Sequence, residues 1–359
     1  MFLLLLTCLQ YHIKNKNSGE EEQRTIGLQP PPHYSEMSDN TVPLVDAHCH
    51  VATIPNLLVE SNDRKNLRSA TTTRCIMTTN PFDHKNLQTY SNDDTVALPF
   101  YKCFGIHPWY THFFTFETDL DNLDTLTHYK SVLQYPESEE DIVLNLVKDK
   151  VLPEPIPIED YISNVNFDEV TCIGEVGLDK SFVIPTCGYY QNSKPVVRTR
   201  IKIKLEHQLR VFERMCQLAD QYSLNVSIHD VNTHMMVLQS CWKIFGQNPK
   251  VSVCLHSWVG SIQFLQGEWI KKFGEHRVFL SLSKYINFKR SPDGTMDYTQ
   301  VPRSMLMTET DYVVDANNDE DLVKELLYIY EQLTRVLKCS SLEECKVLIH
   351  DNFMRFVGS

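Results

Sequence analysis

Six side chains of types that commonly bind metal ions are spread along the chain, each at or near the end of an apolar, β-like run. They are four histidines and two carboxylates: His48, His50, Glu175, His229, His256 and Asp311. A parallel barrel brings all its strand ends to one face, and the active sites of such barrels lie there. Four imidazoles and two carboxylates at one point suit two divalent cations better than one. The sequence therefore predicts a binuclear metal centre.

The first two ligands stand in Asp46-Ala47-His48-Cys49-His50, directly after an apolar run. Side chains of a strand alternate between its two sides, so Asp46, His48 and His50 are expected on one side. Two imidazoles can then reach one metal ion from a single strand end. We interpret Asp46 as a partner that orients an imidazole rather than as a ligand.

Three further ligands end later apolar runs. Glu175 follows residues 170–174, and a carboxylate at the rim of a buried strand is costly unless it is paired or bound to metal. Because a carboxylate has two oxygens, we expect Glu175 to bridge the two cations. His229 and His256 end two consecutive predicted strands, which favours ligation over the alternative of two unrelated core histidines.

The sixth ligand, Asp311, lies in Glu309-Thr310-Asp311. Asp311 is nearer than Glu309 to the loop, so Asp311 is predicted to bind metal and Glu309 to accept a hydrogen bond behind the ligands. Asp311 is also the candidate general base. His107, in Gly105-Ile106-His107-Pro108, ends another apolar run, and we expect it to contact substrate or simply to cap the loop.

Strand-like and helix-like segments alternate along the chain and predict an α/β fold. The eight strand candidates are residues 42–47, 71–78, 101–106, 170–175, 224–228, 251–255, 278–282 and 305–309. The clearest helical segments are 201–222, 233–245, 261–273 and 318–337. This pattern favours a (βα)8 TIM barrel over a doubly wound sheet. Residues 112–168 exceed what one loop and helix need, which indicates an insertion with short helices near 141–149 and 158–164.

Composition bounds the remaining possibilities. The 359 residues suit one barrel with insertions, and a net charge of −12 disfavours wrapping duplex DNA on a broad basic surface.

Residues 1–40 are predicted to be a disordered tail before a barrel domain at 41–359. The apolar start lacks the basic region of a signal peptide and is too short to cross a bilayer. We therefore expect a cytoplasmic or nuclear protein without membrane attachment. The 11 cysteines include no CxxC pair and suggest small buried side chains in a reduced compartment.

At these residues the chain resembles the TatD family of metal-dependent deoxyribonucleases, within the amidohydrolase-like barrels. The segments that carry the resemblance are Asp46-x-His48-x-His50, Gly105-x-His107-Pro108, Gly174-Glu175-Val176-Gly177-Leu178-Asp179, Ile228-His229, Leu255-His256-Ser257 and Glu309-Thr310-Asp311. The long inserts are most similar to the fungal branch of the family. The resemblance implies a metal-dependent hydrolase that cleaves DNA phosphodiester bonds.

The resemblance also implies how the ligands divide. His48, His50 and Asp311 would hold one ion and His229 and His256 the other. The family often carries an arginine two residues after the fifth-strand histidine, whereas this chain has Val231.

The expected activity is two-metal hydrolysis of DNA. Single-stranded or frayed ends are favoured, because a barrel mouth admits one strand more easily than a duplex. Imidazole-rich ligation favours zinc or manganese, and family precedent also allows magnesium. Two alternatives stay open: hydrolysis of an amide or ester in a small molecule, or an adaptor with little turnover that binds a protein partner through residues 112–168.

Overall fold

The computed structural model describes residues 42–52, 69–89, 100–118, 123–191, 197–289 and 296–358. The tail predicted for residues 1–40 lies outside these described residues. Among the helices of the described ranges, none combines the length and the apolar character needed to cross a membrane.

Eight strands form one parallel sheet in which the spatial order follows the chain order. The strands are β1 (Leu44–His50), β2 (Thr72–Met77), β3 (Phe100–Phe104), β7 (Cys172–Asp179), β9 (Asn225–Val231), β10 (Val253–His256), β11 (Val278–Leu282) and β12 (Leu306–Thr308). Each overlaps one of the eight predicted strands. Because every strand pairs with the one before it, all eight carboxyl ends lie on the same face of the sheet.

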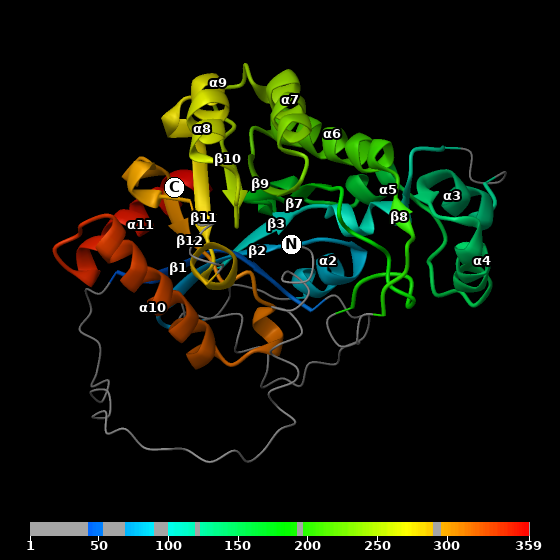
Figure 1. The fold of residues 1–359 in the computed structure, drawn as a ribbon, viewed down its shortest axis with the longest axis horizontal. Helices are drawn as coiled ribbons and strands as arrows, with labels where there is room; N and C mark the ends of the chain where they lie inside the picture. The colour runs from blue at the N-terminus through cyan, green and yellow to red at the C-terminus, as the bar shows by residue number, and fades with distance from the viewer. Residues whose placement is uncertain are drawn as a thin grey trace, which may run out of the picture.

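The first and last strands meet and nearly close the sheet (Figure 1). The backbone N–H of Asp311 donates to the carbonyl of His48 at 3.0 Å, and that of His50 donates to the carbonyl of Tyr312 at 2.8 Å. The Thr308 hydroxyl donates to the carbonyl of Val45 at 2.6 Å. The predicted (βα)8 TIM barrel is confirmed. The hydrogen bonds that close it involve three of the six predicted ligands, His48, His50 and Asp311, so closure and site geometry depend on each other.

Helices cover the outside of the barrel (Figure 1). They are α2 (Pro81–Gln88), α6 (Leu205–Tyr222), α7 (His234–Phe245), α8 (Ile262–Phe264), α9 (Lys271–Phe273), α10 (Asp319–Val336) and α11 (Leu342–Val357). A π-helical stretch, Leu265–Ile270, joins α8 to α9. In α6, Phe212, Cys216 and Ala219 recur every three or four residues and lie on the buried face of the helix. The Tyr330 hydroxyl of α10 accepts a hydrogen bond from the backbone of Val45, which ties that helix to β1.

The long connection between β3 and β7 contains its own small elements. They are β4 (Phe114–Thr115), α3 (Thr125–Val132), β5 (Leu133–Gln134), α4 (Glu140–Lys148), β6 (Ile156–Pro157) and α5 (Ile158–Ser163). Helices α3 and α4 stand to one side of the barrel (Figure 1). Buried His207 of α6 lies 2.9 Å from the Thr111 carbonyl, and His128 of α3 lies 2.9 Å from the His112 carbonyl. The first contact links the connection to α6 on the outside of the barrel, and the second holds α3 to the start of the connection.

We predict that Gly105→Ala strongly destabilises the barrel. A Cβ atom at Gly105 would lie 2.5 Å from the backbone carbon of Gly174 and 2.6 Å from the backbone nitrogen of Glu175. Backbone atoms cannot move aside as a flexible side chain can, so the free energy of unfolding should fall by about 3 kcal/mol. Denaturant unfolding monitored by circular dichroism measures it.

Gly267→Ala is the matched control, since no atom of the described part of the chain lies within 4 Å of its added methyl group. Helical glycine-to-alanine changes usually stabilise, here by at most about 1 kcal/mol. Equal stability of the Gly105→Ala variant and the wild type would show that β3 and β7 do not approach this closely.

Candidate metal centre

The structure brings all six predicted ligands to one face of the barrel. His48 and His50 lie in β1, Glu175 in β7, His229 in β9 and His256 at the end of β10. Asp311 follows the end of β12. One detail differs from expectation: Glu175 does not end its strand, because β7 continues to Asp179 after a register shift between Ile173 and Val176.

Glu175 lies at the centre of this group, and its two oxygens approach different histidines. The Oε2 atom is 3.3 Å from Nε2 of His48 and 3.3 Å from Nε2 of His50. The Oε1 atom is 2.9 Å from Nδ1 of His229 and 2.8 Å from Nε2 of His256. One buried carboxylate therefore separates two imidazole pairs, in the same division that the family resemblance implies.

Asp311 completes the first pair. Its Oδ1 atom lies 3.3 Å from Nε2 of His50. The Asp311 side chain is 23% exposed, compared with 4% for Glu175, so Asp311 is the more accessible of the two carboxylates. Asp311 adopts a left-handed backbone conformation with φ of 58°, held by the hydrogen bond from its N–H to the His48 carbonyl.

Asp46 has a different partner from the one expected. Within the described ranges it contacts no imidazole, but accepts hydrogen bonds from the backbone nitrogen and hydroxyl of Thr310, both at 2.8 Å. The reason is that the barrel closes between β1 and β12, which brings Thr310, two residues after the end of β12, next to Asp46. Burial raises the pKa of Asp46 to about 7. Asp46 thus holds the segment that presents Asp311.

Glu309 lies behind the histidines, where the prediction placed it. It accepts hydrogen bonds from the hydroxyls of Ser257 and Ser281 and lies 3.4 Å from Nδ1 of His256. Glu309 and Asp311 approach different histidines, because β12 ends at Thr308 and the chain turns before Asp311.

His107 lies deeper than a simple substrate contact requires. Its Nε2 atom is 3.3 Å from Oε1 of Glu175, and its ring centroid is 4.4 Å from that of His229. The close approach of Gly105 to the Glu175 backbone brings His107 there. Burial lowers the pKa of His107 to about 4, which keeps the imidazole neutral. His107 is therefore a further candidate ligand, at only 5% exposure.

Two residues that orient the imidazoles were missed in the sequence. Ser227, two residues before His229 on β9, has its hydroxyl 2.9 Å from Nδ1 of His48. Asp179, at the end of β7, has Oδ2 3.5 Å from Nε2 of His229, and Trp109 donates to the same oxygen at 2.7 Å. These contacts leave Nε2 of His48 and Nδ1 of His229 facing Glu175. The only sequence signal for Asp179 was its place at the end of the motif at residues 174–179. The predicted strand 170–175 ended before it, so no contact with His229 was expected.

The charges of the site hold its carboxylates ionised. Burial alone would raise the pKa of Glu175, but the surrounding imidazoles hold it well below its usual range. Burial also acts to raise the pKa of Asp311, but the neighbouring imidazoles, mainly that of His50, outweigh it and lower this pKa. Burial disfavours the cation of His229, yet Asp179 and Glu175 outweigh it and raise the pKa of His229 to about 9.

The donor set fits divalent metal ions. His48, His50 and Glu175 place three ligand atoms close together, and so do His107, Glu175 and His229. The buried Nε2 atom of His48 makes no hydrogen bond in the described structure, as expected of a ligand atom facing a cation. Imidazole nitrogens and carboxylate oxygens are the ligands that zinc and manganese accept.

Comparison with known proteins agrees with this geometry. Residues 45–358 match the family described as TatD related DNase. The chain belongs to the TatD related DNase family. The metal dependence of TatD proteins agrees with these clusters of candidate ligands.

Two relatives and one solved structure place this TatD protein more closely. The Saccharomyces cerevisiae protein named Uncharacterized deoxyribonuclease YMR262W is 37% identical over 319 residues, covering 88% of this chain and 99% of the relative. The Schizosaccharomyces pombe Cut9-interacting protein scn1 is 27% identical over 340 residues, covering 80% of this chain and 92% of the relative. The crystal structure of YjjV, a TatD homologue from Escherichia coli K12, shares the fold with a TM-score of 0.50 at 16% identity, covering 88% of this chain and 98% of that one.

We predict that Asp179→Asn weakens metal binding without unfolding this TatD protein. The amide keeps the shape of the carboxylate but removes the charge that orients His229. Loss of such a partner typically costs about 10–100-fold in metal affinity. Competition titration with a metal chelator measures the change.

Asp230→Asn is the matched control on the neighbouring strand. The Asp230 carboxylate contacts Thr233 and His234, not the imidazole of His229. If both variants bound metal as tightly as the wild type, the orienting role of Asp179 would be wrong.

Proposed function

We propose that this TatD protein is a two-metal phosphodiesterase that cleaves DNA. The observation that carries the proposal is the division of the Glu175 oxygens between two pairs of imidazoles. The family and the budding-yeast relative are both described by deoxyribonuclease activity, which favours phosphodiesters over a small amide or ester.

The ligands divide into two groups that share Glu175. One group is His48, His50 and Asp311, and the other is His229 and His256, with His107 beside them. Divalent ions held there would supply Lewis-acid stabilisation of phosphoryl oxygens and lower the pKa of water. Ligand softness favours zinc or manganese in both positions, and magnesium is the remaining candidate.

Asp311 is the residue best placed to move a proton. It is a carboxylate with a lowered pKa and the more exposed of the two acidic ligands. In the proposed reaction, an Asp311 oxygen accepts the proton of the attacking water and returns it to the leaving oxygen. His50 holds the carboxylate in place through its Nε2 contact.

The proposed substrate is DNA with single-stranded or frayed ends. The net charge of −12 argues against a broad duplex-binding surface, so phosphate recognition would concentrate at the metal centre. Val231 ends β9 at a position where the resemblance leads us to expect an arginine. Because valine is uncharged, the rim of the barrel carries one positive charge fewer for binding phosphate.

We also propose that residues 112–168 bind a protein partner. The fission-yeast relative is named for an interaction with Cut9, and α3 and α4 stand to one side of the barrel (Figure 1). This role would be additional to catalysis. Proteins that co-purify with the wild type but not with a variant altered at exposed charges of α4 would support it.

The Asp311→Asn variant tests the catalytic proposal. The amide keeps the shape and one oxygen donor but cannot accept the proton, so turnover should fall about 10²–10⁴-fold. Cleavage of end-labelled single-stranded DNA by metal-loaded protein measures turnover, and metal content is determined on the same sample. Asp321→Asn, at an exposed site in α10, should cleave like the wild type. Undiminished turnover of Asp311→Asn would remove this residue from the mechanism.

Val231→Arg tests the substrate class. An arginine–phosphate pair is worth about 1.5–3 kcal/mol, so DNA should bind more tightly, and the gain should shrink as salt rises. Michaelis constants for DNA and for a neutral ester, at two salt concentrations, measure this. Val347→Arg adds the same charge on α11 and should change neither constant. Weaker DNA cleavage with unchanged ester cleavage would favour the ester alternative.

A further inference from the structure

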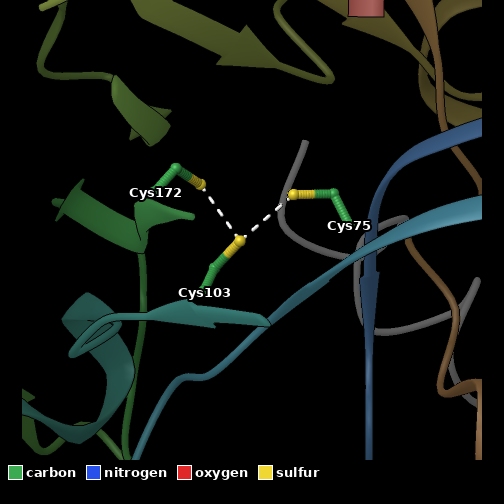
Figure 2. Close-up of side chains that lie close together, drawn as sticks. All are labelled: Cys75, Cys103 and Cys172. Carbon is green, nitrogen blue, oxygen red and sulfur yellow. Dashed lines mark hydrogen bonds between the residues drawn. The ribbon is translucent and has the colours of Figure 1, made fainter. Parts of the chain in front are cut away.

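Three cysteine thiols meet inside the barrel, apart from the candidate metal centre (Figure 2). Cys75, Cys103 and Cys172 come from the neighbouring strands β2, β3 and β7. The Cys103 sulfur lies 3.1 Å from that of Cys75 and 3.1 Å from that of Cys172. All three sulfurs lie within 4.8 Å of one another, and none of the residues is more than 2% exposed. The strand register brings them together, because Cys103 pairs directly with Cys172.

The spacing suits one central atom bonded to all three sulfurs. A disulfide needs sulfurs about 2.05 Å apart and would leave the third thiol unused. Thiophilic elements bond sulfur at about 2.3 Å, as zinc does, so three sulfurs around one atom stand roughly 3.5–4 Å apart. Two of the sulfur separations, at 3.1 Å, are a few tenths of an ångström shorter than this, and the third is no more than 4.8 Å, so small side-chain shifts suffice.

Charge decides which element fits. Three thiolates around a monovalent ion carry a net charge of −2, and around a divalent ion −1. Burying such a charge in a barrel core is costly without a counterion. The neighbouring cation along β2, Arg74, is already paired with Asp319. A trivalent element gives a neutral complex and avoids the cost.

We propose that Cys75, Cys103 and Cys172 form a binding site for a trivalent metalloid of the arsenous acid type. Three S–H bonds and three As–O bonds break, three As–S bonds form, and three water molecules leave, with no change in oxidation state. Both the free acid and the bound product are uncharged, which suits a buried site. The product joins three adjacent strands, with Cys172 three residues before Glu175 on β7.

The hydrogen bonds among the thiols favour this reaction. Contacts from Cys103 and Cys75 lower the pKa of the Cys172 thiol to about 6. A thiolate is the reactive form of cysteine, so Cys172 supplies the first sulfur at neutral pH, and the proton that it has released joins the first departing hydroxide to form water. The two remaining thiols then lie close enough to displace the remaining hydroxyl groups.

Native mass spectrometry of the reduced full-length protein with sodium arsenite tests the site. We expect one arsenic per chain, with a mass increase of one arsenic atom less three hydrogens. If only two thiols bound arsenic, the adduct would keep one hydroxyl group and the protein would lose two hydrogens instead of three. Its mass would therefore exceed that of the three-bond adduct by one water molecule. X-ray absorption at the arsenic edge should find three sulfur neighbours in the wild type, independently of any variant.

Cys103→Ser should weaken arsenite binding at least tenfold and eliminate the three-bond mass. Cys241→Ser is the matched control, a buried cysteine in α7 outside this group, and should bind like the wild type. No bound arsenic in the wild type, a hydroxyl-bearing adduct, or a three-bond adduct that survives Cys103→Ser would each overturn the proposal. The candidate metal centre is not needed for this result, because His229→Ala combined with His256→Ala should bind arsenite equally well.

Discussion

One buried carboxylate constrains the rest of the structure. Glu175 is 3% exposed, and imidazoles of three strands, β1, β9 and β10, and of the loop after β3 approach it. Removing a carboxylate from water costs several kcal/mol unless positive charge or hydrogen-bond donors surround it. The barrel meets this demand by directing histidines at both oxygens. Each imidazole that gives up its proton to a metal ion offers a lone pair, so the same arrangement that holds Glu175 creates two groups of metal ligands.

The residues behind the ligands turn this arrangement into a defined geometry. Ser227 and Asp179 contact the outer nitrogens of His48 and His229, so that the inner nitrogens face Glu175. Asp46 holds Thr310 and thereby the neighbouring Asp311. These contacts cross between strands that are distant in sequence. The site therefore depends on barrel closure, and a substitution behind the ligands is expected to affect metal binding before it affects stability.

The sequence predicted the barrel and its six candidate ligands because apolar runs ending in histidine or carboxylate are local signals. It could not predict contacts set by strand register. Asp179 was missed since β7 runs beyond Glu175, and the partner of Asp46 differs because the segment after the last strand supplies the nearest donor. The deep position of His107 follows from the approach of Gly105 to β7. The meeting of Cys75, Cys103 and Cys172 likewise depends on pairing between strands.

Metal content tests the central claim most directly. Protein purified in metal-replete buffer is analysed by inductively coupled plasma mass spectrometry, together with the His229→Ala, His256→Ala double variant. The account predicts close to two divalent ions per wild-type chain and one or none in the variant, with the fold of both intact by circular dichroism. A folded wild-type protein without bound metal would contradict the binuclear centre.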